Sequence, residues 1–186
     1  MIIEKKWTAH LPELDLAIST GLHKGNQYAL RWDMVDWKSR ELHIPNTETK
    51  NGKPLHVPLN DAAIAALKVA FEAGGGKGRA FKSKKTGDPL ENGRHWFDDG
   101  IVLAKLKNFH WHDLRHTFAS RLRMKGAPLE DTADLLGHKS LTMTRRYARL
   151  GPNKLHAVVS LLGSSDATSD TSQNTVSAAV LQGIAK

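Results

Sequence analysis

The sequence of 186 residues contains no cysteine. This absence excludes disulfide bonds and cysteine-ligated zinc, and it fits a reducing cytoplasm, where we expect the protein to be located. The sequence also has no apolar run close to the length of a membrane span and no signal-peptide pattern at its start. We therefore expect no membrane partner.

Acidic residues are too few to balance the basic ones. Lys and Arg number 27 against 19 Asp and Glu, which gives a net charge of +8 and an isoelectric point near 9.8. The residues from Gly151 onward carry two lysines and two aspartates, so the full +8 lies in the part before them. A basic body of this size, long enough for one domain with a real core, predicts a polyanionic partner such as double-stranded DNA. Charge alone does not distinguish this from a merely basic protein.

The stretch from His112 to Tyr147 concentrates the groups needed to cleave a phosphodiester. A protein hydroxyl can attack phosphorus without metal or water if cationic donors hold the non-bridging oxygens and an acid protonates the leaving alkoxide. His112 and Arg115 are three residues apart and share one face of a helix, so both can point at one phosphate. Tyr147 suits the attack because a phenolate is both a nucleophile and a leaving group, which makes the step reversible.

These residues, with the flanking Leu-Arg-His-Thr-Phe-Ala, resemble the active-site region of the tyrosine recombinases, the family of phage integrases and related site-specific recombinases. The resemblance extends from about Leu11 to Leu162. It implies that His112 and Arg115 form the His-x-x-Arg box, that His138 is the histidine after Leu-Gly, and that Tyr147 forms a 3′-phosphotyrosyl link. A type IB topoisomerase uses similar chemistry, but the surroundings of Tyr147 are more similar to an integrase.

The sequence departs from this family at His23. Family members carry Thr-Gly-x-Arg, whose arginine is the first phosphate clamp, where this chain has Thr-Gly-Leu-His23. Asn26 stands where the family usually has a glutamate. A neutral histidine offers one donor in place of a charged bidentate fork, so we expect impaired cleavage. The alternative is a catalytically degenerate member that only binds DNA or partner protomers, which leaves enzymatic activity open.

The resemblance also implies a catalytic lysine on a small antiparallel sheet. We predict a mainly helical fold with three strands, of the tyrosine-recombinase catalytic-domain type. The candidate segments for this sheet are residues 35–37, 41–44 and a hairpin of 47–50 with 53–58 across Asn51-Gly52. Lys50, at the hairpin tip, would protonate the 5′-oxygen leaving group. Without the other motifs, Lys50 would be interpreted as a solvated surface lysine.

Apolar spacing and capping residues predict the helices. The first two predicted helices run from Leu11 to Thr20 and through Leu30 and Trp32. The next two are one capped by Asn60 and ended by Gly74-Gly75-Gly76, and one around Phe97 and Ile101. The last three are the His112 helix with Leu114, Phe118 and Leu122 buried, a short helix from Pro128 to Gly137, and one capped by Ser140 that carries Tyr147.

Two basic clusters are candidates for phosphate contacts that position the protein without reading sequence. The first is a glycine-containing run that we expect to be a mobile loop, and the second precedes the tyrosine. They comprise Lys77, Arg79, Lys82, Lys84 and Lys85, and Arg145 and Arg146. Both clusters are equally compatible with solvated surface charge.

A metal-dependent hydrolase is the least favoured alternative. His112 and His116 are four residues apart and could bind zinc in a helix, but Asp113 replaces the glutamate of a metalloprotease motif and no third ligand is evident. Arg115 would also place a cation beside the metal. We therefore expect no metal and no cofactor, and we interpret His116 as a structural residue.

The expected organisation is a catalytic domain over 1–163, a flexible linker over 164–175 and a tail over 176–186, without the N-terminal core-binding domain that family members carry. The tail contains a small apolar stripe: Val176, Ala179, Val180 and Ile184. The default interpretation of this segment is a frayed terminus. The same resemblance implies instead that it mediates self-association on DNA.

Overall fold

The computed structural model describes residues 8–49, 52–82, 94–151 and 159–160. Nearly all of these lie in one compact unit, Met1–Pro152; the second unit is Asn153–Lys186. The predicted domain end at 163, the linker 164–175 and the tail 176–186 lie outside the described residues. Within the described part, no helix is both long and apolar enough to cross a membrane.

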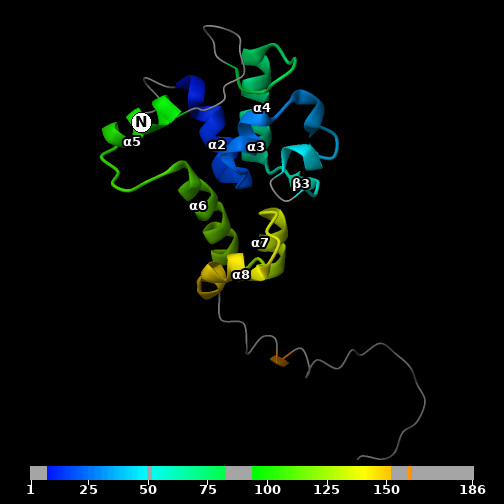
Figure 1. The fold of residues 1–186 in the computed structure, drawn as a ribbon, viewed down its shortest axis with the longest axis vertical. Coiled ribbons are helices and arrows are strands. Elements are labelled where there is room, and N and C mark those ends of the chain that lie inside the picture. Colours follow the sequence, from blue (N-terminus) through cyan, green and yellow to red (C-terminus); the bar gives the residue numbers. More distant parts are fainter. Residues whose placement is uncertain (1–7, 50–51, 83–93, 152–158, 161–186) are drawn as a thin grey trace, which may run out of the picture. The chain divides into compact units, whose positions relative to one another are not determined.

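Helix α2, Leu11–Thr20, is central to the compact unit and ends where the sequence predicts. It packs against α4, Asp61–Gly74, and α6, Trp111–Met124 (Figure 1). Gly21 ends it in the left-handed conformation, with φ 64°, and donates its N–H to the Ala17 carbonyl. The backbone passes close to α6 at this turn. A Cβ on Gly21 would lie only 2.4 Å from the Phe118 ring.

We expect Gly21→Ala to lower the free energy of unfolding more than an ordinary capping change does. The left-handed backbone costs an alanine about 1–2 kcal/mol, and overlap with the Phe118 ring adds about 1–3 kcal/mol. Gly75→Ala is the matched control, because Gly75 caps α4 with φ 71° and a Cβ there meets nothing within 4 Å. Urea unfolding measures both variants; equal losses would contradict the role given to Phe118.

The three strands form one antiparallel sheet in the order β1, Val35–Asp36, β2, Glu41–Ile44, and β3, Leu55–Pro58. This confirms the predicted fold class, a mainly helical protein with a small three-stranded antiparallel sheet. In β2 and β3, Leu42 pairs with Val57 and His43 with His56. Leu42 and Val57 are buried while both histidines are exposed, so one face of the sheet packs on the core.

The predicted strand over residues 47–50 is wrong in its described part. Asn46–Glu48 form a 3-10 helix, η3, and the partner of β3 is β2. This register buries Leu42, Ile44 and Val57 together, which outweighs the local hairpin signal of Asn51-Gly52. Lys50 and Asn51 lie outside the described residues.

The second predicted helix is shorter than expected. Helix α3 covers Lys24–Ala29, and Trp32 lies in a separate 3-10 helix, η2, Trp32–Met34. Between them the chain is extended and bonded to a distant loop: the Leu30 carbonyl accepts from the Ala80 N–H at 2.8 Å and the Trp32 N–H donates to the Gly78 carbonyl at 3.1 Å. These non-local hydrogen bonds replace the helical ones.

A buried carboxylate, Glu13, ties α2 to its neighbours. It is 3% exposed and accepts hydrogen bonds from the Tyr28 hydroxyl at 2.5 Å and from Trp96 Nε1 at 3.2 Å, and it pairs with His10 Nδ1 at 2.7 Å. Trp96 belongs to α5, Arg94–Leu103, and His10 to η1, Thr8–His10. Four elements therefore converge on one charged group, which must keep its donors to stay buried.

The C-terminal part of the compact unit consists of short elements. Helix α7 covers Leu129–Leu135, α8 covers Leu141–Thr144 and a 3-10 helix, η4, covers Arg145–Leu150. The predicted caps are confirmed: the Asn60 side chain accepts from the Ala63 N–H at 2.9 Å and Ser140 from the Thr142 N–H at 3.2 Å. The prediction that the helix capped by Ser140 carries Tyr147 is wrong, because α8 ends at Thr144 and Tyr147 lies in η4, which packs against α6.

Candidate active site

Arg115 joins the ends of two other helices to α6. Its side chain is buried, and its two terminal nitrogens donate to the Gly21 carbonyl at 2.6 Å and to the Leu136 carbonyl at 2.5 Å. Burial lowers the pKa of the guanidinium to about 10, so it stays cationic at neutral pH. The arginine is thereby a fixed positive charge where the ends of α2 and α7 meet α6.

His23 and the His112–Arg115 pair surround one cavity of about 350 Å³. The His23 and His112 rings are stacked, with centroids 5.9 Å apart and planes 22° from parallel. Trp111 also lines the cavity, and the Lys24 ammonium lies 5.5 Å from the centre of its ring. Three residues predicted for phosphate contact are therefore brought together from α6 and the start of α3.

A second cavity, also of about 350 Å³, shares His23 with the first. His23 and Asn26 line both cavities, and His138 and Thr49 line the second. Thr49 immediately precedes Lys50 in the chain. The chain just before Lys50, the predicted catalytic lysine, thus reaches the cavity that His138 also lines.

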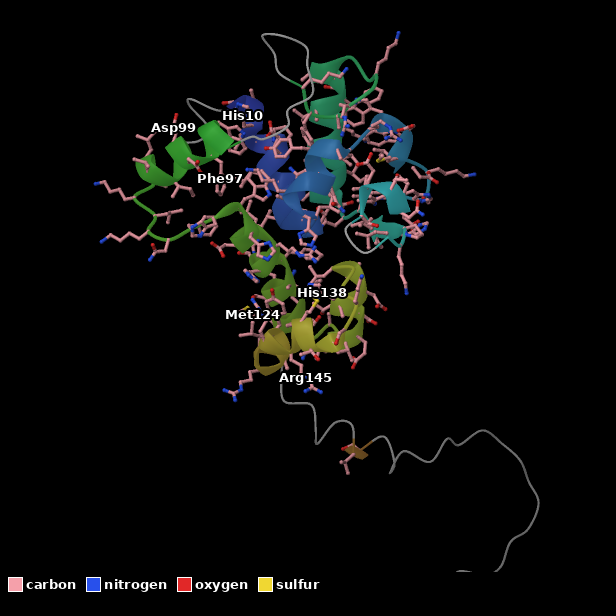
Figure 2. The ribbon with its side chains drawn as sticks, viewed as in Figure 1. His10, Phe97, Asp99, Met124, His138 and Arg145 are labelled. Carbon is pink, nitrogen blue, oxygen red and sulfur yellow. The ribbon has the colours of Figure 1, made fainter. Side chains whose placement is uncertain are left out.

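His138 follows α7, at the turn through Gly137, and lies between α6 and α7 (Figure 2). Its Nδ1 is hydrogen-bonded to the Thr144 hydroxyl at 2.7 Å. Burial, followed by the positive charges of Arg115 and Arg146, lowers its pKa to about 4. The imidazole is therefore neutral at pH 7, and its remaining ring nitrogen can serve as a single uncharged donor.

We expect the His138 ring to titrate near pH 4 in the DNA-free protein. Because this folded-state pKa is below the ordinary value of 6.5, the unfolded chain binds the extra proton first as pH falls. The contribution to stability is complete above pH 6.5 and is lost progressively between pH 6.5 and 4. A proton NMR titration of the ring, assigned with His138→Gln, measures the midpoint; a value of 6.5 or higher would contradict the proposed surroundings of the ring.

Tyr147 is buried, at 6% exposure, and its hydroxyl is hydrogen-bonded to His116 Nδ1. Burial raises the pKa of the phenol, while the charges of Arg146 and Arg115 act in the opposite direction. Arg145 and Arg146, which precede it in η4, are both exposed. The candidate nucleophile is therefore protonated at neutral pH and lies within the electrostatic reach of Arg115.

The sequence interpretation of His116 as a structural residue missed its contact with Tyr147. The His116 ring also meets the His112 ring edge-on, with centroids 4.7 Å apart. Four rings consequently form a row: His23, His112, His116 and Tyr147. The sequence does contain one sign that His116 faces the site. It lies four residues after His112, and this spacing places both histidines on one helical face.

The described residues of the first basic cluster do not line either cavity of this site. Lys77, Arg79 and Lys82 follow α4, at the end of the unit away from α8 (Figure 1). Arg79 is half-buried and donates to the Tyr28 carbonyl at 3.5 Å, and the Lys82 ammonium donates to the Lys77 carbonyl. Lys84 and Lys85 lie outside the described residues. The phosphate role predicted for these five residues stays a prediction.

Within the described part of the chain, one group of side chains could hold a metal ion. It comprises Glu41, His43 and His56 on the sheet, whose ligand atoms lie within 4.8 Å of one another. His112 and His116, the pair considered for zinc from the sequence, do not belong to such a group. The metal-ligating geometry is therefore separate from Tyr147.

The fold and the arginine, histidines and tyrosine that it gathers belong to the class of tyrosine-recombinase catalytic domains. The profile of the phage integrase family matches residues 3–154. The chain is 30% identical over 175 residues to the integrase of Salmonella phage P22, covering 87% of this chain and 45% of that protein. It is 31% identical over 140 residues to the shufflon-specific DNA recombinase of Escherichia coli, covering 73% and 33%.

Solved structures agree on the fold. The catalytic domain of bacteriophage HP1 integrase matches with a TM-score of 0.66 and 22% identity, covering 88% of each chain. The Tn1549 transposon integrase, solved with a circular intermediate DNA, matches with a TM-score of 0.66 and 19% identity, covering 86% of this chain and 59% of the other. The chain belongs to the phage integrase family and spans less than half the length of the two curated relatives named above.

Proposed function

We propose that this chain is the catalytic domain of a site-specific DNA recombinase that cuts and rejoins DNA through Tyr147. The observation that supports this most is the gathering of Arg115, His112 and His138 with a buried tyrosine at the junction of α6, α7 and η4. Each group has a chemical use there. A cation and neutral imidazole donors can hold the non-bridging oxygens of one phosphate beside a hydroxyl nucleophile.

The proposed reaction is a transesterification. The Tyr147 oxygen bonds to phosphorus, the bond from phosphorus to the 5′-oxygen breaks, and the tyrosine is left joined to the 3′-phosphate. The departing 5′-oxygen takes a proton, and Lys50 is its proposed donor on the strength of the family resemblance. The reverse reaction restores the tyrosine and rejoins the strand, so no external energy source is needed.

We further propose that His23 impairs this reaction. It lines both cavities, where an arginine would add a second bidentate charged clamp. The competing proposal is a degenerate chain that only binds DNA or partner protomers. It is favoured by His23 and Asn26, whereas the retained Arg115, His138 and Tyr147 favour surviving chemistry.

Trapping a covalent intermediate tests the proposal. The protein is incubated with nicked duplexes, pooled from random sequences, in which the strand downstream of the cut diffuses away and blocks religation. We expect an adduct on a denaturing gel, and peptide mass spectrometry should find the nucleotide on Tyr147. An adduct on another residue would contradict the mechanism; binding without an adduct in either the wild type or His23→Arg would favour the degenerate alternative.

Double-stranded DNA is the proposed partner. The net charge of +8 and the exposed Arg145 and Arg146 beside Tyr147 support phosphate contacts. A related structure, the Tn1549 integrase, contains DNA. We propose weak binding that decreases steeply with salt, and the proposed cytoplasmic location is compatible with access to DNA. An affinity that is unchanged between low and moderate salt would contradict phosphate-driven binding.

The proposed self-association involves residues 176–186, which lie outside the described residues. Its support is the apolar stripe of Val176, Ala179, Val180 and Ile184 together with the resemblance to recombinases whose C-terminal segments dock on a neighbouring protomer. A dilution series followed by light scattering compares the chain with and without residues 164–186. Identical behaviour of the two chains would remove the proposal.

A further inference from the structure

The hydroxyl of Tyr147 is engaged by a histidine outside the residues that family resemblance assigns to catalysis. His116 Nδ1 is hydrogen-bonded to it, and the two rings lie with centroids 5.8 Å apart. His116 is half-buried on α6, directly after Arg115. The phenolic proton must leave this hydroxyl when the oxygen attacks phosphorus, so its present hydrogen-bond partner is the group best placed to receive it.

His112 has different surroundings. It is exposed, its ring is stacked on His23, and it lines the first cavity with Arg115. Among the hydrogen bonds of the described residues, one joins the Tyr147 hydroxyl to His116 and none joins it to His112. His112 is therefore placed to contact a phosphate in the cavity, and His116 is placed to contact the nucleophile.

We propose that His116 is the catalytic base that accepts the phenolic proton of Tyr147 as the phenolic oxygen attacks phosphorus. This inference rests on the proposed strand-cleavage function. It gives the two histidines of α6 different roles, since His112 faces the phosphate side of the row of rings and His116 faces the tyrosine. Thr117 and Phe118, which follow on the helix, offer no titratable group that could accept the proton.

The protonation state of His116 suits a proton acceptor. Burial, followed by the charge of Arg146, lowers the pKa of its imidazole, so the ring is neutral at pH 7. To accept the phenolic proton, the neutral ring must carry its hydrogen on Nε2 and present the Nδ1 lone pair to the hydroxyl, and the inference assigns this tautomer to His116. The nearby charges are Arg146, Asp113 and Arg115, of which only Asp113 favours protonation.

The same charges couple the proton transfer to DNA binding. In the DNA-free protein, Arg115 and Arg146 oppose formation of an imidazolium, while burial holds the proton on Tyr147. A bound phosphate brings negative charge beside these arginines and offsets their repulsion of the imidazolium. The base therefore becomes effective when its substrate is present, and the nucleophile stays protonated otherwise.

The step balances. The bond from Tyr147 oxygen to phosphorus forms, the bond from phosphorus to the 5′-oxygen breaks, and the phenolic proton moves to His116 Nδ1. The leaving oxygen takes a separate proton from the proposed donor, Lys50. After cleavage His116 is an imidazolium, and in the reverse reaction it returns its proton to Tyr147.

The first test needs no DNA and therefore separates this inference from the proposed function. Nitrogen-15 NMR of the histidine rings is recorded for the wild type and Tyr147→Phe, with His116→Gln for assignment. We expect His116 to carry its hydrogen on Nε2, and its Nδ1 resonance to change in Tyr147→Phe while that of the exposed His56 does not. Hydrogen on Nδ1, or no change in Tyr147→Phe, would overturn the inference.

The second test separates the base from the acid. On duplexes whose 5′-bridging oxygen is replaced by sulfur, the leaving group departs without protonation, so loss of the acid is tolerated while loss of the base is not. We expect His116→Gln to form adduct about 10²- to 10⁴-fold more slowly than the parent on this substrate, whereas Lys50→Ala approaches the parent rate. His23→Arg serves as the parent if the wild type is too slow.

The pH profile distinguishes a base from a positioning residue. The parent rate should fall at acid pH as His116 becomes protonated, and His116→Gln should lose this ionisation while His112→Gln retains it. An unchanged acid limb in His116→Gln would overturn the inference. Absence of adduct in every form would contradict the proposed function instead, and the DNA-free NMR result would still support or overturn the hydrogen-bond role of His116.

Discussion

Replacing His23 by arginine is expected to raise the rate of DNA cleavage about 10²- to 10³-fold, the effect of one preorganised donor to a developing oxyanion. His23 lines both cavities of the site and is stacked on His112, so a guanidinium there would reach the phosphate proposed to bind between them. It would add a permanent charge and two parallel donors in place of one neutral donor. Single-turnover adduct formation on the nicked duplexes measures the change.

Two variants control for charge and for the nucleophile. His23→Lys supplies a cation without the planar fork, so a gain in His23→Arg that exceeds the gain in His23→Lys assigns the effect to bidentate geometry. His23→Arg combined with Tyr147→Phe should form no adduct. Equal rates for the wild type and His23→Arg would show that position 23 does not limit cleavage.

Arg115→Lys is expected to lower both cleavage and stability. The loss of a bidentate donor to the phosphate reduces the rate about 10²- to 10³-fold. A lysine has one nitrogen in place of the two that bond the Gly21 and Leu136 carbonyls, so we expect one carbonyl to lose its donor, and a buried acceptor left without a partner costs about 1–3 kcal/mol. The free energy of unfolding, from urea titration, and the single-turnover rate measure the two effects.

Arg121→Lys is the matched control, because Arg121 lies on the same helix and is exposed. We expect this change to leave stability within about 0.5 kcal/mol of the wild type. If Arg115→Lys were as stable as Arg121→Lys, the two carbonyl contacts would not contribute to the fold. If it were unstable but cleaved at the parent rate, Arg115 would be structural and not a phosphate ligand.

The features that sequence predicts well depend on local chemistry. The caps at Asn60 and Ser140 and the left-handed stop at Gly21 each involve a residue and its near neighbours along the chain. The His112 helix is predictable for the same reason. Helical spacing also places Arg115 and His112 on a shared face, and they do line one cavity.

The features that sequence does not predict depend on contacts between distant segments. The partner of β3 is set by burial of Leu42 and Val57, which overrides the hairpin signal of the nearer Asn51-Gly52 turn. Glu13 is buried because Tyr28 and Trp96, from two other helices, supply its donors. Apolar periodicity contains no information about such partners, so a charged residue in the core could not be foreseen.

The role inferred for His116 also depends on a contact between distant segments, so the sequence does not predict it. Helical spacing places it on the face of His112, but only the packing of η4 on α6 decides which histidine meets the Tyr147 hydroxyl. Two rings four residues apart are equivalent candidates until that packing is known. The distinction between phosphate ligand and proton acceptor therefore belongs to tertiary structure.

The two clamp positions differ in what the rest of the chain requires of them. Arg115 holds the ends of α2 and α7 through backbone carbonyls, so we expect its loss to affect folding as well as the proposed chemistry. His23 precedes α3 in an extended backbone conformation, φ −62° and ψ 144°, that any residue adopts. Under the proposed function, we therefore expect a change at position 23 to alter cleavage more than it alters the backbone of the domain.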